Sequence, residues 1–155
     1  NKIIRYKNYI YPNGGVTVTG GEPLLQVKFL IELFKKLKEE NIHTCIDTSG
    51  MVALTDDVKK LLSLTDLVLL DIKQINSEKC KNLVGFNNDK ELAFAQYLSD
   101  NNIHMWIRQV LVPGYTDDEQ DLLKLKDFIS SLNTVDKIEI LPYHDMGRYK
   151  WEKLG

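Results

Sequence analysis

The sequence predicts an α/β fold with a parallel sheet, in one domain that covers residues 1–155. Short runs rich in apolar and β-branched residues alternate with segments whose apolar residues recur at helical spacing, in the order strand, then helix. No fixed-period repeat, low-complexity tract or linker separates these segments. Strands that are each followed by a helix pair in parallel through right-handed crossovers. A doubly wound sheet and a closed or partial barrel both satisfy this pattern.

The first half of the chain contains two predicted strand and helix pairs. Residues 15–21 (GVTVTGG) form a β-branched run that ends in two glycines and predicts a strand. A helix follows from Pro23 to Asn41, and its apolar stripe consists of Leu30, Leu33, Phe34 and Leu37. Residues 42–47 (IHTCID) predict the second strand, and residues 56–64 predict a short amphipathic helix.

The second half continues the alternation. Residues 67–72 (LVLLDI) are almost entirely apolar, as is typical of a strand covered on both faces. A looser segment follows, and then a helix over residues 91–102 and a strand over residues 103–112. Thr116 and Glu119 have the spacing of a capping box. The helix that they begin has an apolar stripe of Leu122, Leu125, Ile129 and Leu132. Residues 137–141 (KIEIL) predict the last strand.

Composition excludes several classes of protein. Twenty Lys and Arg residues against 22 Asp and Glu residues leave a net charge of -2, which is too balanced for nucleic-acid binding. No apolar run is long enough to span a membrane, and the N-terminus has no signal-peptide core, so we expect a cytoplasmic protein with no membrane partner. The two cysteines, Cys45 and Cys80, are far apart and lack CxxC spacing. A disulfide framework or a thiolate metal site of the chain's own is therefore not expected.

Polar residues occur where each predicted strand ends, which is where ligands bind in parallel α/β folds. Each has a structural alternative: Gly-Gly before a helix forms tight turns, and Asp71 with Lys73 forms ion pairs. Together they offer carboxylates, cations and exposed backbone, which a zwitterionic ligand requires. These residues are Gly20, Gly21, Glu22, Asp47, Thr48, Asp71, Lys73, Arg108 and His144.

Several well-known motifs are missing from the sequence. There is no GxGxxG or GxxxxGK[ST], so neither a dinucleotide fingerprint nor a P-loop is available. HExxH and GxSxG are also missing. A sugar-phosphate-binding barrel remains an alternative, although Glu22 beside the glycine turn would repel a phosphate.

The ordered motifs resemble those of a known family. Residues 20–23 (GGEP) resemble the GGE motif of radical S-adenosylmethionine enzymes. The segments 42–50, 71–74, 106–108, 112–114 and 141–144 resemble, in order and close spacing, the activases of glycyl radical enzymes. Residues 143–151 (YHDMGRYKW) favour the branch that activates pyruvate formate-lyase. An activase of another glycyl radical enzyme and a non-catalytic S-adenosylmethionine-binding module remain alternatives.

This resemblance implies an incomplete (β/α)6 TIM-like partial barrel that binds S-adenosyl-L-methionine and a [4Fe-4S] cluster. In that family a 5′-deoxyadenosyl radical takes hydrogen from a glycine of the partner enzyme, and a reduced flavodoxin or ferredoxin type protein donates the electron. The resemblance places Asp47, Thr48 and Asp71 around a monovalent cation. The cofactor-binding residues that it implies are Gly20, Gly21, Glu22, Asp47, Thr48, Asp71, Ile72, Lys73, Arg108 and His144.

One part of the family pattern is missing from the chain. The family holds its cluster with three cysteines in a CxxxCxxC loop before the GGE strand, whereas this sequence has only Cys45 in a strand and Cys80, expected in a loop. We therefore expect that the sequence begins after the cluster loop, lacks the first barrel strand, and binds no cluster and is inactive alone. Without a first strand, residues 16–19 would form an open sheet edge, which predicts self-association there.

Overall fold

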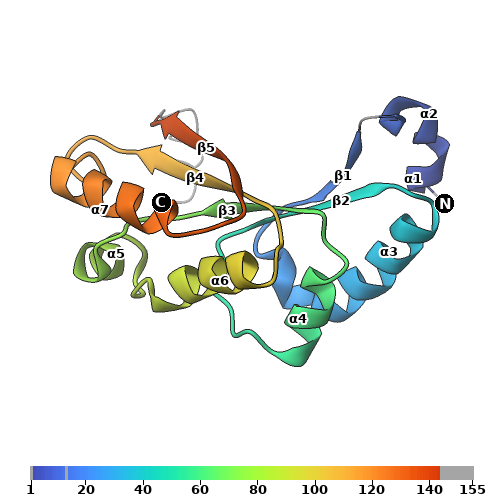
Figure 1. Cartoon of the computed structure of the whole chain (residues 1–155), viewed down its shortest axis with the longest axis horizontal. Helices are drawn as coiled ribbons and strands as arrows, with labels where there is room; N and C mark the ends of the chain where they lie inside the picture. The colour runs from blue at the N-terminus through green and yellow to red at the C-terminus, as the bar shows by residue number, and fades with distance from the viewer. Residues whose placement is uncertain (1, 13, 144–155) are drawn as a thin grey trace, which may run out of the picture.

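A computed structural model describes residues 2–12 and 14–143. Its centre is a parallel sheet of five strands, β1 (Gly15–Val18), β2 (His43–Thr48), β3 (Leu67–Asp71), β4 (Met105–Leu111) and β5 (Val135–Pro142). The strands lie in the order β1-β2-β3-β4-β5 (Figure 1). The predicted α/β class with a parallel sheet is therefore confirmed.

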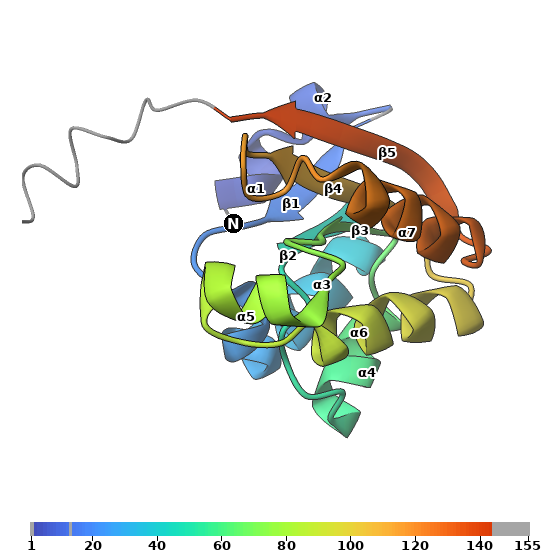
Figure 2. The same ribbon diagram turned by 90° about the vertical axis from the view of Figure 1, so that its left-hand side faces the viewer.

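The strand order also decides between the two architectures that the sequence left open. A doubly wound sheet reverses its strand order at a switch point, whereas here each strand lies beside the next one in the chain. Right-handed crossovers of this kind place successive helices on the same face of the sheet. Figures 1 and 2 show α3, α4, α5 and α6 together on one side of the curved sheet. This is the arrangement of a partial barrel.

The helices agree with most of the predicted segments. Two short helices, α1 (Lys2–Arg5) and α2 (Lys7–Ile10), precede β1 and were not predicted. The predicted first long helix is divided into a 3-10 turn, η1 (Pro23–Gln26), and α3 (Val27–Glu39). The others are α4 (Asp56–Leu62), α5 (Ser77–Val84), α6 (Asp89–Asp100) and α7 (Glu119–Ser130). None of the helices in the described part of the chain is long and apolar enough to cross a membrane.

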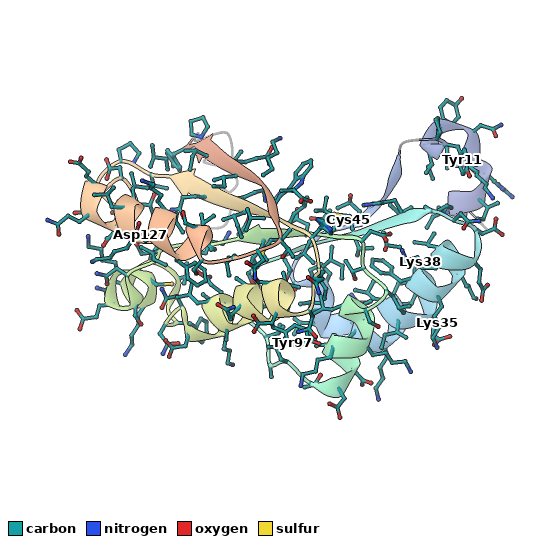
Figure 3. All side chains as sticks on the ribbon, in the orientation of Figure 1. Tyr11, Lys35, Lys38, Cys45, Tyr97 and Asp127 are labelled. Carbon is teal, nitrogen blue, oxygen red and sulfur yellow. The ribbon has the colours of Figure 1, made fainter. Side chains whose placement is uncertain are left out.

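The core lies between the sheet and its helices. Alternate strand residues point toward the helices, and Ile46, Val68, Leu70 and Ile107 are fully buried there. The predicted stripe of α3 meets them with Leu30, Phe34 and Leu37. Residues of opposite parity, among them Cys45 near the middle of β2 (Figure 3), lie on the other face of the sheet.

Two local predictions were wrong. The looser segment contains α5, whose first N–H groups at Glu78 and Lys79 donate to the side chain of Asn76, so Cys80 lies in a helix and not in a loop. Helix α7 is capped by Asp118, which accepts from the Asp121 N–H, and not by Thr116. The Thr116 hydroxyl instead donates to the Val110 carbonyl, which fixes the loop after β4.

Candidate functional site

The carboxyl ends of three neighbouring strands bring four charged side chains together on the face of the sheet opposite the helices. Asp47 is the second-to-last residue of β2, Asp71 is the last residue of β3, and Arg108 lies on β4 beside Asp71 in the sheet register. Lys73 follows β3 two residues after Asp71 and therefore lies on the same side. Their contacts bring these four of the predicted residues together.

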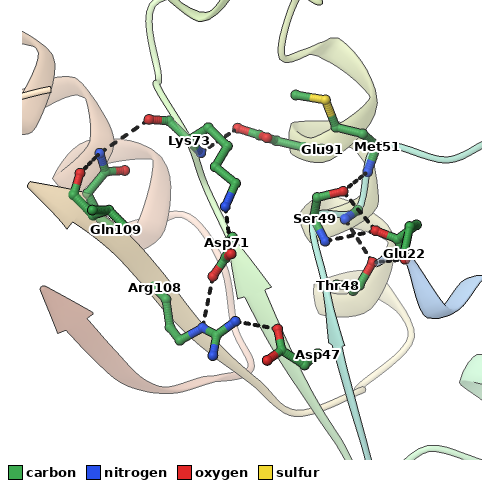
Figure 4. Close-up of polar contacts among 12 residues, drawn as sticks. Glu22, Asp47, Thr48, Ser49, Met51, Asp71, Lys73, Glu91, Arg108 and Gln109 are labelled. Atoms are coloured by element: carbon green, nitrogen blue, oxygen red, sulfur yellow. Dashed lines mark hydrogen bonds and ion pairs between the residues drawn. The ribbon is translucent and has the colours of Figure 1, made fainter. Parts of the chain in front are cut away.

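The contacts form one continuous row, which we call the charged row and define as Asp47, Arg108, Asp71 and Lys73 (Figure 4). Arg108 Nε donates to Asp71 Oδ1 at 2.8 Å, and Arg108 Nη2 donates to Asp47 Oδ1. Lys73 Nζ donates to the other oxygen of Asp71 at 2.7 Å. Two carboxylates and two cations leave the row with no net charge, although each group can bind a charged part of a ligand.

Arg108 is the most enclosed cation of the row. Its side chain is 17% exposed, against 34% for Lys73. Burial lowers the pKa of Arg108, but the hydrogen bond to Asp47 and the charge of Asp71 outweigh that effect, so the net shift is upward. Arg108 is thus a fixed, permanently charged bridge between β2 and β3.

Glu22 does not join this row. Its carboxylate accepts from Thr48 Oγ1 at 2.7 Å, from Ser49 Oγ at 2.8 Å and from the N–H groups of Ser49 and Leu24 at 3.1 Å. Both carboxylate oxygens are therefore used within the protein. They fasten the turn after β1 to the end of β2, a role that the sequence analysis did not foresee.

The glycine turn that Glu22 fastens leaves its backbone open. Gly20 has a φ of +132°, a conformation that side chains disfavour. A Cβ at Gly20 or Gly21 would meet no atom within 4 Å. The turn therefore offers accessible backbone groups beside the charged row.

Two further predicted site residues, Thr48 and Ile72, are not part of the charged row. The Thr48 hydroxyl donates to Glu22 and accepts from the Gly50 N–H, and Ile72 is fully buried toward the helices. His144 lies outside the described residues. The described residues form no group of three or more His, Cys, Asp or Glu side chains that could hold a metal ion, so the cation site at Asp47, Thr48 and Asp71 stays a prediction.

A buried carboxyl group, which was not predicted, lies beneath the row. Glu91 of α6 is fully buried, and its Oε1 accepts from the Lys73 N–H at 3.2 Å. Its Oε2 has no hydrogen-bond partner among the described residues. Burial raises the pKa of Glu91 to about 8. The hydrogen bond from the Lys73 N–H and the charge of Lys73 lower this pKa, and the negative charge of Asp71 raises it further. Glu91 lies three and seven residues before Phe94 and Leu98, which are buried on α6, and this spacing was the available signal.

The row and the turn fit the methionine part of S-adenosylmethionine, whose ammonium needs acceptors and whose carboxylate needs a cation. The cysteines do not fit an iron–sulfur cluster. Cys45 and Cys80 are both buried on different elements, and burial raises the pKa of each thiol, that of Cys80 to about 11. Iron ligation requires thiolates, so these two residues are poor cluster ligands.

Comparisons with known proteins show which family this chain is similar to. The family model described as the Radical SAM superfamily matches residues 1–125. The pyruvate formate-lyase-activating enzyme of Staphylococcus aureus (strain USA300) is 52% identical over 163 aligned residues, which cover 100% of this chain and 64% of that enzyme. The chain thus spans less than two thirds of the length of this curated relative.

Solved structures show the same architecture. A domain of pyruvate-formate lyase-activating enzyme from Bacteroides vulgatus superposes with a TM-score of 0.78 at 30% identity, over 86% of this chain and 83% of that domain. Streptococcus suis SuiB bound to S-adenosylmethionine superposes with a TM-score of 0.75 over 96% of this chain and 34% of SuiB. At 21% identity, the likeness to SuiB concerns the fold alone.

Proposed function

The chain belongs to the radical SAM superfamily, and from this premise we propose that it forms the S-adenosylmethionine-binding part of an enzyme that generates the glycyl radical of pyruvate formate-lyase. The similarity at 52% identity to an enzyme of that name supports the proposal. The observation that carries it is the neutral charged row beside an open glycine turn, because a zwitterion can exchange ion pairs there without leaving a net charge.

The proposal assigns a task to each part of the site. Backbone carbonyls at Gly20 and Gly21 accept from the ligand ammonium, and Lys73 donates to the ligand carboxylate. Glu22 holds the turn in place. Asp47 and Arg108 set the position of Asp71, and His144 is proposed as a further contact to the cofactor.

In this proposal the cofactor supplies the reactive chemistry, and the protein binds and aligns the cofactor. When bound, S-adenosylmethionine would supply the organic radical that removes hydrogen from a glycine of the partner. The residues of this chain bind and orient it and exclude water. Because Cys45 and Cys80 do not fit a cluster, no step is assigned to them. We include a flavodoxin or ferredoxin type electron donor and a cytoplasmic location in the same proposal.

Calorimetric titration of the 155-residue chain with S-adenosylmethionine tests the binding part. We expect saturable binding that Lys73→Met weakens by about 10- to 100-fold, since a hydrogen bond to a charged group contributes about 1.5–3 kcal/mol. Lys35→Met is the matched control, because Lys35 lies on α3 in an exposed ion pair with Glu32. Equal affinities for both variants would contradict the assignment of Lys73.

The radical reaction needs a separate test. The protein expressed from the complete reading frame that encodes this chain is reconstituted with iron and sulfide, reduced, and mixed with pyruvate formate-lyase and S-adenosylmethionine. We expect the electron paramagnetic resonance doublet of a glycyl radical. Tight binding of S-adenosylmethionine without that signal would support a non-catalytic binding module instead.

A further inference from the structure

A large hollow on the described surface lies outside the charged row. It has a volume of about 640 Å³ and is formed by η1, the loop after β2, and the end of α5 with the beginning of α6. Its apolar lining consists of Leu25, Met51, Val52 and Phe86. We call it the lysine-edged groove, because Lys81 and Lys90 also line it.

The apolar side chains of this groove are unusually accessible. Leu25 is 78% exposed and Phe86 is 70% exposed. Exposed large apolar side chains that gather in one hollow mark an interaction site more often than scattered ones do. A groove of this volume holds a few side chains of a polypeptide segment.

The charge of the groove indicates what its occupant carries. Neither Lys81 nor Lys90 forms an ion pair with any carboxylate in the described residues. Glu22 is the single acidic residue in the lining, and its oxygens already accept four hydrogen bonds. The groove is therefore an apolar surface with two available cations at its edge, which complements an apolar segment flanked by Asp or Glu.

The groove is continuous with the proposed cofactor site. Glu22 and Ser49 line it; Glu22 directly follows Gly20 and Gly21, and Ser49 directly follows Asp47 and Thr48 at the end of β2. Figure 4 shows Glu22, Ser49 and Met51 side by side on one flank of the charged row. A polypeptide that reaches the mouth of the barrel from this flank must cross the groove.

We propose that the lysine-edged groove is a docking site for the partner enzyme, and that it binds a segment with apolar side chains next to acidic ones. This inference rests on the proposed function, since the partner is the glycyl radical enzyme. Docking here would supply affinity away from the reacting glycine, so that the glycine segment itself can remain open to the cofactor.

Charge reversal tests the proposal. The variant Lys81→Glu with Lys90→Glu and the variant Phe86→Ser are compared with a control, Lys60→Glu with Lys126→Glu, whose lysines are exposed on α4 and α7. Affinity for pyruvate formate-lyase is measured by surface plasmon resonance at two salt concentrations, and affinity for S-adenosylmethionine by calorimetry. Thermal unfolding verifies that all variants fold.

We expect the charge-reversed pair to weaken partner binding at least 10-fold, Phe86→Ser to weaken it severalfold, and the control pair to change it less than twofold. The effect of the charge-reversed pair shrinks at high salt. Equal partner affinity for the charge-reversed and control pairs would overturn the docking site. So would a wild-type chain that binds S-adenosylmethionine but not pyruvate formate-lyase. A wild-type chain that does not bind S-adenosylmethionine would instead refute the proposed function.

Discussion

Replacing Glu91 by glutamine removes the carboxyl group that the fold buries beneath the charged row. Glu91 has no exposed surface, and only its Oε1 has a partner, the Lys73 N–H. The amide side chain introduced by Glu91→Gln would keep an oxygen acceptor for that N–H and nearly the same volume. The substitution therefore changes mainly the ability of the site to ionise.

The free-energy consequence follows from the pKa. In the folded protein the pKa of Glu91 is raised from its ordinary value of 4.5 to about 8. Well below pH 4.5 the group is protonated in both states, so it does not make the free energy of unfolding depend on pH there. Between pH 4.5 and about 8 only the unfolded chain releases the proton, so the free energy of unfolding falls by about 1.4 kcal/mol per pH unit. Over the whole window the loss is about 5 kcal/mol.

Urea unfolding of the wild type and Glu91→Gln from about pH 5 to about pH 7.5 measures this loss. Other groups titrate in both proteins, so their contributions cancel in the difference between the two free energies of unfolding. We expect the variant to gain about 3 kcal/mol over the wild type across this range. A difference that stays constant with pH would refute the reasoning, because it would mean that Glu91 ionises as easily in the fold as in the unfolded chain.

Three further substitutions test the fold and the row. Gly50→Ala should lower the free energy of unfolding by about 2–4 kcal/mol, because Gly50 has a φ of +67° and an added Cβ would lie 2.8 Å from a β3 leucine methyl group. Gly85 also has a positive φ, +86°, but an added Cβ would meet no atom within 4 Å, so Gly85→Ala should lower the free energy of unfolding by only about 1–2 kcal/mol. Equal losses for the two variants in urea unfolding would contradict the packing argument. Arg108→Met should lower the free energy of unfolding by about 3–5 kcal/mol at neutral pH, because it leaves Asp47 and Asp71 without their bridging cation. A loss below about 1 kcal/mol in the same assay would show that the fold does not need this bridge.

The charged row could be predicted because two simple rules apply to it. Apolar β-branched runs located the strands, and the carboxyl ends of parallel strands meet at one edge. Side-chain alternation then places Asp71 and Lys73 on one face of the sheet. The strand register adds Arg108 to the same face, beside Asp71. The strand order itself was not predictable, because the same alternation of strands and helices suits a doubly wound sheet.

The features that escaped prediction depend on side-chain direction or weak patterns. Glu22 follows the glycine turn, in which Gly20 has a positive φ, and the sequence does not show that its carboxylate turns back toward Thr48. Helix α5 buries only Cys80, so its residues have no clear apolar stripe. Glu91 lies in the first turn of a helix, where acidic residues are common, so its helical spacing from the buried Phe94 and Leu98 was only a weak signal.

The two cations of the row are not equivalent, and this difference explains how a neutral row can accept a ligand. Arg108 holds Asp47 and Asp71 at once through two different nitrogens, so moving it would expose two carboxylates. Lys73 holds only Asp71, on the oxygen that Arg108 does not use, and is twice as exposed. If Lys73 turns to a ligand carboxylate, Asp71 keeps its bond to Arg108, so the charge of Asp71 stays compensated. Lys73 then exchanges one ion pair for another, and no buried charge is left without a partner.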